Sequence, residues 1–204
     1  MEQRSEEWFA ARAGRITASC FVDVIALTKA GTPTAARSKY MRSLAFERLA
    51  GVAKVGPSAR SLEWGTEAET FAGPAYEVES GNVIRPAAFM THPQYAFIGG
   101  SPDGLVRTDG LVEIKCPHDE TVHVLTLLEG MPAEHMPQVQ GNLLVTGRKW
   151  ADFISYDPRQ SERFRLFVQR VPRDDAYCNK LLAALLQFEA ELKQMVATIE
   201  KKAA

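Results

Sequence analysis

The sequence pattern in the middle of this chain constrains its fold more than any other segment. Between residues 83 and 115, short runs of β-branched and aromatic residues alternate with tight-turn sequences, whereas the flanking segments have helical spacing. The dipeptide Asp109-Gly110 between two apolar runs is a strong hairpin signal. We therefore expect strands over four segments, Val83–Phe89, Tyr95–Ile98, Leu105–Arg107 and Leu111–Lys115.

Four helices are expected before this region. Apolar spacing and capping residues predict them at about Ser5–Arg12, Thr17–Leu27 (capped by Thr17 or Ser19), Ser38–Ala50 and Ser61–Glu79. The glycine and proline content of Lys29–Arg37 and Gly51–Ala59 predicts loops, and Pro74 is expected to kink the fourth helix.

More helices and a second strand pair are expected after it. They are predicted at about Glu120–Glu129, Ala133–Val145 (interrupted early by Pro137), Trp150–Tyr156 and Arg163–Val171, before a long amphipathic helix at Asp174–Glu200. The apolar stripe of that last helix is Tyr177, Leu181, Leu185, Phe188, Leu192, Met195 and Ile199. A central mixed β-sheet between helices predicts an α/β fold around one core.

Length and composition favour one domain. The 204 residues, 46% of them apolar, suit one well-covered core and are few for two. We expect a single domain over residues 1–204, divided into parts at 1–60, 61–171 and 172–204. No stretch has the roughly 18 consecutive apolar residues of a membrane span, and the acidic start lacks a signal-peptide core. Three widely spaced cysteines argue against a disulfide framework or a zinc site, so we expect a reducing cytoplasm.

The charges are unevenly distributed. Residues 1–60 carry ten Lys/Arg against five Asp/Glu, whereas the remainder carries fourteen against twenty, for a net charge of −1. A basic first third on an acidic body fits a protein that attracts phosphates at one surface and cations at another. Ordinary solvated helix faces explain the same charges equally well.

Two carboxylates and a lysine are predicted to meet at one end of the sheet. The segment Gly100-Ser101-Pro102-Asp103-Gly104 leads through a short strand and a turn to Glu113-Ile114-Lys115. Side chains alternate along a strand, so Glu113 and Lys115 share one face and Ile114 points to the other. The hairpin would bring Asp103 back beside Glu113.

This grouping favours a divalent cation. Two close carboxylates raise each other's pKa unless a cation neutralises them, and Mg²⁺ does so with oxygen ligands. The Ile114 carbonyl would supply a further oxygen, and Lys115 would orient water or stabilise charge on a phosphate. Taken singly, a turn Asp-Gly and an exposed Glu/Lys strand face are both common structural features; their order and spacing favour a site.

These segments resemble the catalytic signature of the PD-(D/E)xK nuclease superfamily, with its restriction-endonuclease-like core. The wider pattern is similar to the phage-type alkaline exonucleases of the YqaJ viral recombinase group, the family of bacteriophage lambda exonuclease. Five blocks between about Ser5 and Pro158 stand in that family's order: Glu6-Glu7-Trp8, Ala11-Arg12-Ala13-Gly14-Arg15-Ile16-Thr17-Ala18-Ser19, Trp64-Gly65 with Glu69, Glu113-Ile114-Lys115-Cys116-Pro117 and Gln138-Val139-Gln140.

The resemblance implies roles for the matching residues. Two Mg²⁺ ions, or Mn²⁺ in their place, would be held by Glu69, Asp103, Glu113 and Ile114, while the catalytic group would be Asp103, Glu113, Lys115 and Gln138. Arg12 and Ser19 would bind a 5′-phosphate, and Arg15, Lys29 and Leu62 would contact DNA, Leu62 as a wedge between strands. A surface arginine, a simple helix cap, a solvated helix glutamate and a core leucine are the ordinary alternatives for these residues.

Two positions depart from the family pattern. Gly141 stands where an aromatic residue is often found, and His135 stands where a tyrosine is expected. We expect His135 to be a partly buried structural residue. The four histidines show no ligand spacing and are given no catalytic role.

The implied activity is metal-dependent 5′→3′ digestion of one strand of linear duplex DNA to 5′-mononucleotides, leaving a 3′ overhang. Residues 1–60 would bind the DNA end and residues 61–171 would form the catalytic core. By resemblance the protein would form a ring-shaped homotrimer, pass its product to a single-strand annealing recombinase, and act in the cytoplasm of a bacterial or phage-infected cell, with no membrane partner. The rival functions are a structure-specific or restriction-type endonuclease, which would cut closed DNA, and a non-catalytic DNA-end-binding recombination scaffold.

Overall fold

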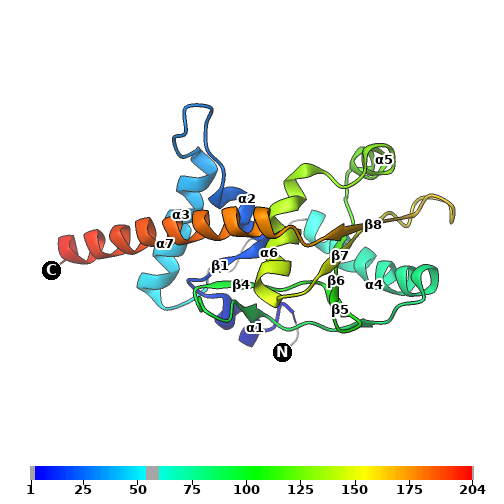
Figure 1. Ribbon diagram of the computed structural model, residues 1–204, viewed down its shortest axis with the longest axis horizontal. Helices are drawn as coiled ribbons and strands as arrows, with labels where there is room; N and C mark the ends of the chain where they lie inside the picture. Colours follow the sequence, from blue (N-terminus) through cyan, green and yellow to red (C-terminus); the bar gives the residue numbers. More distant parts are fainter. Residues whose placement is uncertain (1–2, 54–59, 204) are drawn as a thin grey trace.

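The computed structural model describes residues 3–53 and 60–203, except for the side chains of residues 60–63 and 66. It has an α/β architecture in which helices flank two mixed sheets (Figure 1). The helices are α1 (Glu6–Arg12), α2 (Phe21–Val24), α3 (Ala35–Ala50), α4 (Arg60–Ser80), α5 (Glu120–Glu129), α6 (Met136–Thr146) and α7 (Asp175–Ala203), with 3₁₀ turns at Ala18–Cys20 and Ala133–His135. The strands are β1 (Ile16–Thr17), β2 (Ile84–Arg85), β3 (Met90–Thr91), β4 (Ile98–Gly100), β5 (Gly104–Val106), β6 (Gly110–Lys115), β7 (Trp150–Tyr156) and β8 (Leu166–Pro172).

The larger sheet has the order β2-β5-β6-β7-β8. Its central pair, β6 and β7, is parallel, and its other pairs are antiparallel. The chain crosses over through α5 and α6 between the two central strands, as a parallel pair requires. The pair is in register from Gly110 opposite Trp150 to Lys115 opposite Ser155, so β6 ends beside a long neighbouring strand that supports it.

Alternation along β6 divides its side chains between two helices. Val112 and Ile114 pack with Tyr76 of α4, whereas Leu111 packs with Val139 and Leu143 of α6. Each side chain buried on such a face contributes roughly 1.5–3 kcal/mol relative to an exposed one. Glu113 follows Leu111 by two residues and therefore lies on the α6 face, under this helix.

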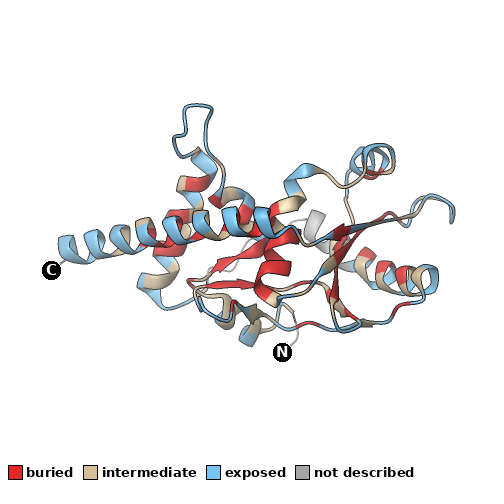
Figure 2. Cartoon of the chain, viewed as in Figure 1, coloured by how far each residue is buried: buried red, intermediate tan, exposed pale blue. Residues whose placement is uncertain are grey.

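The smaller sheet has the order β1-β4-β3 and was not expected from the sequence. It lies against a third apolar cluster that joins the N-terminal helices to α7; its largest fully buried members are Ile16, Phe21, Ile98, Leu185, Phe188 and Leu192. Helix α7 crosses this cluster and extends beyond it toward the C-terminus, where its residues are exposed (Figures 1 and 2). Phe21 and Leu185 therefore connect the beginning of the chain to its last helix.

Several expected boundaries match the structure. The predicted segments Glu120–Glu129 and Trp150–Tyr156 are α5 and β7. The expected mixed α/β architecture is confirmed, with two sheets in place of one. Of the expected strand Val83–Phe89, only Ile84–Arg85 forms strand β2.

Other boundaries were predicted wrongly. The second helix ends at Val24 instead of reaching Leu27, and α3 begins at Ala35, inside the expected loop, because the Thr34 hydroxyl accepts a hydrogen bond from the Arg37 amide. Residues 133–145 divide into a 3₁₀ turn and α6, with Pro137 in the first turn of α6, where its missing N–H costs nothing. Ile199, assigned to the apolar stripe of α7, is 41% exposed.

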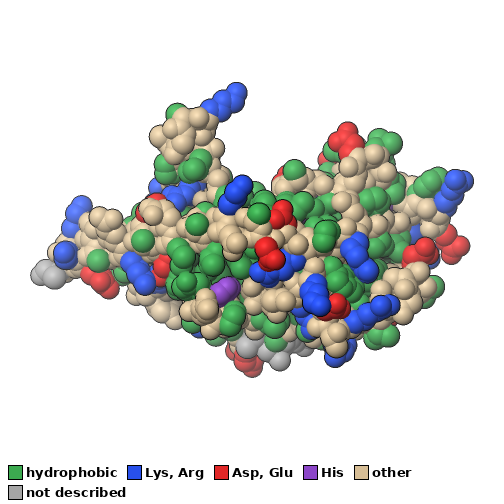
Figure 3. Space-filling view, in the orientation of Figure 1, with side chains coloured by type: hydrophobic (Ala, Val, Ile, Leu, Met, Phe, Trp, Pro, Cys, Tyr) green, Lys and Arg blue, Asp and Glu red, His purple; other side chains and the backbone are tan. Residues whose placement is uncertain are grey.

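The segment between α2 and α3 projects from the body of the molecule (Figure 1). An isolated bridge between Leu27 and Pro33 closes it, and Lys29 is its one Lys or Arg residue. A basic side chain stands at its tip in Figure 3, where acidic and basic groups are otherwise interspersed over the visible face. Within residues 3–53 and 60–203, no helix combines the length and apolar character needed to cross a bilayer.

Candidate active site

Asp103 is fastened to the end of β6 by two hydrogen bonds. Its backbone N–H donates to the Val112 carbonyl (3.1 Å), and its carboxylate Oδ2 accepts from the Ile114 N–H (2.6 Å). The hairpin of β5 and β6 therefore brings Asp103 beside Glu113, as the sequence predicted. Burial raises the pKa of Asp103 well above its usual value, and the nearby Glu113 carboxylate raises it further.

Glu113 is buried under α6 and accepts hydrogen bonds on both carboxylate oxygens. Lys115 Nζ donates to Oε1 (2.6 Å), Gln138 Nε2 donates to the same oxygen, and Asn142 Nδ2 donates to Oε2 (3.0 Å). Gln138 and Asn142 are four residues apart on α6 and so face the same carboxylate. The expected group of Glu113, Lys115 and Gln138 is thus brought together by the structure.

Lys115 connects these groups. Its Nζ also donates to Gln138 Oε1 (3.3 Å), so the amide and the carboxylate fix the ammonium from two sides. Burial acts against the charge on Lys115, but Glu113 and Asp103 outweigh burial and raise its pKa. The lysine is therefore a fixed cation, suited to stabilising negative charge on a bound phosphate.

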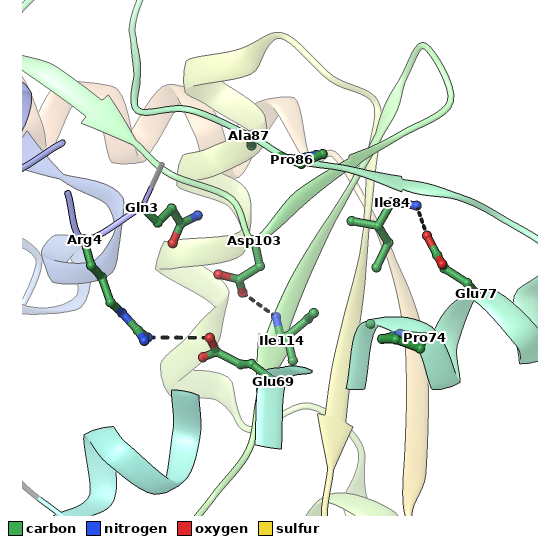
Figure 4. Close-up of a pocket in the computed structure, with 11 residues that line it drawn as sticks. Gln3, Arg4, Glu69, Pro74, Glu77, Ile84, Pro86, Ala87, Asp103 and Ile114 are labelled. Carbon is green, nitrogen blue, oxygen red and sulfur yellow. Dashed lines mark hydrogen bonds and ion pairs between the residues drawn. The ribbon is translucent and has the colours of Figure 1, made fainter. Parts of the chain in front are cut away.

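Glu69 projects from α4 into a pocket that it shares with Asp103 and Ile114 (Figure 4). Its carboxylate forms an ion pair of 3.5 Å with Arg4. Burial raises the pKa of Glu69 above its ordinary value. The positive charges of Arg4 and Lys115 act in the opposite direction, and the Glu113 carboxylate adds to the rise. Three of the four expected metal ligands, Glu69, Asp103 and Ile114, thus line one pocket. The fourth, Glu113, lies on the α6 side of β6, where it is paired with Gln138 and Asn142.

Within the described residues, no three carboxylate, histidine or cysteine side chains form a preformed metal cage. The hydrogen bonds give a physical reason, because each carboxylate already has an internal donor: Arg4 for Glu69, the Ile114 amide for Asp103, and Lys115 for Glu113. The donor chemistry still fits a hard divalent cation, since the Glu113 and Glu69 carboxylates are both close enough to repel the negative charge of Asp103. Metal binding by these residues remains a prediction.

The structure also brings Arg12 and Ser19 together. Arg12 Nη2 lies 3.4 Å from Ser19 Oγ and 3.3 Å from Thr17 Oγ1, and its guanidinium is stacked 4.1 Å from the Trp8 ring. Two hydroxyls and an oriented guanidinium form a suitable anion site. Ser19 lies inside a 3₁₀ turn and Cys20 is the N-cap residue of α2, so the expected capping of the second helix by Thr17 or Ser19 is wrong.

One cavity runs from Ser19 of this anion site to the catalytic group, whereas Arg12 and Thr17 line a neighbouring one. Ser19 and Val22 line it from the N-terminal part, Lys115 lines it from β6, and Gln138 and His135 line it from the α6 side. Residues almost a hundred positions apart in sequence therefore face one space. Ser19 of the expected phosphate site and Lys115 and Gln138 of the expected catalytic site therefore share one cavity.

The other expected DNA contacts are scattered. Arg15 is engaged with backbone carbonyls, donating to Ala96 O (2.9 Å) and to Ala11 O, which suits a structural role as well as a DNA contact. Lys29 is exposed on the projecting loop, and the side chain of Leu62 lies outside the described residues. His135 is partly buried and stacked on Phe153. Burial lowers the pKa of His135.

Sequence reasoning missed several residues that shape the site. Asn142 binds Glu113, and its spacing of four from Gln138 was an available signal. Trp8 Nε1 donates to Ser101 Oγ (2.9 Å), which connects α1 to the loop carrying Asp103, and no local pattern announces a contact across 93 residues. The pairing of Arg4 with Glu69 was likewise not foreseen.

Most of this chain matches one known protein family. The model of the YqaJ-like viral recombinase domain matches residues 7–149. The chain belongs to this family. No curated protein sequence matches it.

Solved structures of similar proteins agree with this assignment. The YqaJ-type chain described here is 39% identical to an alkaline exonuclease (LHK-Exo) from Laribacter hongkongensis over 98% of both chains, with a TM-score of 0.88. The complex of LHK-Exo with dAMP gives a TM-score of 0.90 at the same identity and coverage. A phage related exonuclease from Haemophilus somnus 129PT is 17% identical over 93% of this chain and 96% of its own, with a TM-score of 0.71, which shows the fold alone.

The departure at Gly141 has a structural cause. A Cβ at this position of α6 would lie 2.4 Å from the Phe21 ring, so any larger residue would require Phe21 or one of the two helices to shift. Close helix packing explains why this family member carries glycine there.

Proposed function

We propose that this protein is a metal-dependent 5′→3′ exodeoxyribonuclease that digests one strand of linear duplex DNA and leaves a 3′ overhang. Family membership and the 39% identity to an alkaline exonuclease support the reaction class. The observation that carries the direction of digestion is the single cavity lined by Ser19, Lys115 and Gln138. A 5′-phosphate held near Ser19 would direct hydrolysis to the bond at the end of the same nucleotide.

The residues have distinct roles in this proposal. Arg12 and Ser19 bind the terminal phosphate, because an arginine fork and a hydroxyl provide several donors to one phosphate group. Lys115 stabilises the charge that develops on the scissile phosphate, and Gln138 and Glu113 hold its ammonium in place. The dAMP bound by LHK-Exo is a mononucleotide, the kind of product that this reaction releases.

Glu69, Asp103, Glu113 and the Ile114 carbonyl would hold two Mg²⁺ ions, or Mn²⁺. When bound, such ions supply activation of water and stabilisation of the leaving 3′-oxygen. Arg15, Lys29 and Leu62 would contact the DNA further from the reacting bond. Oxygen donors suit both metals, so the ligand set alone does not separate them.

By family resemblance, the protein would act as a ring-shaped homotrimer and pass its 3′ strand to a single-strand annealing recombinase. A ring around DNA would keep a chain of net charge −1 on a polyanion, since topology can replace part of the electrostatic affinity. The proposed setting is the cytoplasm of a bacterial or phage-infected cell.

The experiment uses linear duplex DNA with a phosphate on one 5′ end and a hydroxyl on the other, each strand labelled separately. Wild type, Lys115→Ala, Arg12→Ala and the exposed-lysine control Lys180→Ala would be compared in Mg²⁺ and in EDTA. We expect metal-dependent loss from the phosphorylated end. Lys115→Ala should slow it by about 10²–10³-fold, the usual loss of a charge-stabilising group. Arg12→Ala should remove the preference for the phosphate, and Lys180→Ala should behave as wild type.

Other outcomes separate the rival functions. Cutting of a closed circular duplex would indicate an endonuclease in place of an exonuclease. Binding of DNA ends without any hydrolysis in either metal would leave only the recombination scaffold. Equal digestion of phosphorylated and hydroxyl ends by wild type would contradict the role of Arg12 and Ser19.

A further inference from the structure

Arg4 occupies an unusual place for a residue so close to the beginning of the chain. Its side chain lines the pocket that contains Glu69, Asp103 and Ile114, and its guanidinium forms the 3.5 Å ion pair with Glu69 (Figure 4). Nothing in the family signature assigns this arginine a role. It is nevertheless the cation that meets the helix-borne carboxylate of the expected metal site.

The chain on both sides of Arg4 is fastened to the loop that carries Asp103. Gln3 Nε2 donates to the Pro102 carbonyl (3.0 Å). Four residues after Arg4, Trp8 Nε1 donates to Ser101 Oγ. Arg4 is therefore held over the pocket by two hydrogen bonds that its own side chain does not make.

The backbone of Arg4 is also in a costly conformation. Its φ of 69° lies in the left-handed region, which non-glycine residues rarely adopt and which costs about 1 kcal/mol or more. Among the described non-glycine residues, Arg107 is the other with a positive φ. A charged side chain kept at such a position, in a pocket lined by carboxylates, points to a function that offsets the strain.

A guanidinium and a divalent cation cannot share Glu69 without repelling each other. Both favour the same carboxylate oxygens, and like charges separated by a few ångströms interact unfavourably even where the pocket is open to solvent. A cation bound by Glu69 would therefore displace the Arg4 guanidinium from this carboxylate. The side chain of Arg4 is 47% exposed, so it has room to turn outward.

We propose that Arg4 is a substrate-positioning residue of this site: its guanidinium and a divalent cation compete for Glu69, and the guanidinium displaced from Glu69 binds a backbone phosphate of the DNA. A planar guanidinium matches the oxygens of a phosphate with two parallel hydrogen bonds. DNA held for cleavage must bring a phosphate to this pocket. The inference rests on the proposed nuclease function and adds an exchange of partners by Arg4 to it.

The two parts of the exchange predict effects of opposite sign for Arg4→Ala. Calorimetric titration with Mn²⁺ alone should show tighter binding than wild type by about two- to fivefold, the range of an exposed ion pair. Binding to a 5′-phosphorylated duplex in Ca²⁺, followed by fluorescence anisotropy over a range of KCl, should be weaker. The slope of log K against log salt should fall in magnitude by about 0.9, as for the loss of one phosphate contact.

Three further variants serve as controls. Glu69→Gln should weaken Mn²⁺ binding, which locates the ion at this carboxylate. Arg4→Gly removes the same charge and also relieves the positive φ, so it should match Arg4→Ala in both binding assays and exceed it in thermal stability. Arg107→Ala removes the other arginine with a positive φ, whose Nε donates to Asn82 Oδ1. This variant should leave the affinity for Mn²⁺ unchanged.

The outcomes distinguish the two proposals. If wild type binds Mn²⁺ in a Glu69-dependent way but Arg4→Ala binds it no more tightly, or keeps the wild-type salt slope, the exchange by Arg4 is wrong and the nuclease proposal stands. If wild type fails to bind Mn²⁺, or binds it independently of Glu69, the metal site is wrong and the role of Arg4 falls with it.

Discussion

Asn142 is fully buried between strand β4 and the Glu113 carboxylate. Its amide nitrogen serves Glu113, which leaves Oδ1 as the one buried side-chain polar atom of the described residues without a hydrogen-bond partner. This oxygen lies 2.3 Å from the position that a Cβ on Gly100 would take. Asn142 thus satisfies the buried Glu113 carboxylate with its amide nitrogen, while its own Oδ1 has no hydrogen-bond partner. The closeness of this oxygen also leaves no room for a side chain at position 100.

We predict that Asn142→Ala destabilises the protein by about 1–3 kcal/mol, because Glu113 Oε2 loses a charged hydrogen bond in a buried setting. Urea unfolding at pH 7 would measure the change in the free energy of unfolding. Asn179→Ala, on the exposed side of α7, should stay within about 0.5 kcal/mol of wild type. Wild-type stability of Asn142→Ala would mean that Lys115 and Gln138 alone compensate the charge of Glu113.

At this scale, local rules predicted part of the site. Alternation along a strand and one hairpin suffice to place Asp103 beside Glu113 and Lys115 on the same face as Glu113. The ion pair of Arg4 with Glu69 depends on how two distant segments pack, so residue spacing carries no trace of it. The roles given to all these residues remain predictions.

Helix α6 packs against Phe21 of α2 through a glycine, Gly141. A Cβ at Gly141 would overlap the Phe21 ring of α2, whereas a Cβ at Gly65, in α4, would meet no atom of the described side chains within 4 Å. Both glycines lie inside helices, where alanine is intrinsically preferred.

The two glycines therefore predict opposite results. Gly141→Ala should destabilise the protein by about 1–3 kcal/mol through overpacking, in spite of the better helix propensity of alanine. Gly65→Ala should stabilise it by about 0.4–1 kcal/mol, because the unfolded chain loses conformational freedom. Thermal unfolding of both variants checks the pair, and a gain in stability for Gly141→Ala would show that α2 can move aside.

Elements with strong periodicity were predictable, and short ones were not. α5 and β7 were found at their expected boundaries, since their patterns extend over seven residues or more. β1 and β3 have two residues each and exist because they pair with β4; β1 and β4 lie 82 positions apart in sequence. So short a strand has no pattern of its own, and the second sheet could not be foreseen.

At the scale of the whole molecule, one buried carboxylate connects three distant segments. Asp157, after β7, accepts hydrogen bonds from Arg159 Nε (2.9 Å) and Nη2 (2.8 Å). The same guanidinium lies 4.6 Å from the ring of Trp64, whose Nε1 donates to the Pro117 carbonyl beyond β6. The hydrogen bonds from Arg159 lower the pKa of Asp157.

The ion pair of Asp157 with Arg159 predicts how the stability of the fold depends on pH. A lowered carboxyl pKa stabilises the fold above the unfolded value of about 3.9, and that stabilisation is lost as pH falls through the folded value. Asp157→Asn should therefore lower the free energy of unfolding at pH 7 and reduce its dependence on pH below about 4. Urea unfolding between pH 3 and pH 7 would test this, and parallel curves for variant and wild type would contradict it. Asp103, whose pKa is raised by burial, makes a contribution of opposite sign in both proteins. That contribution cancels when the free energies of unfolding of variant and wild type are subtracted.

The parallel pairing of β6 with β7 has a consequence for the order of folding. Glu113 and Lys115 are synthesised more than twenty residues before Gln138 and Asn142, which lie in the crossover helix between the two strands. Until that crossover closes, a carboxylate and an ammonium at the end of a hairpin have only each other and water. The crossover must close a long loop before its contacts form, so its formation is slower than that of the hairpin. The site is thus completed by one of the later long-range steps of folding, and a nascent or partly refolded chain already contains Asp103, Glu113 and Lys115 without the architecture that organises them.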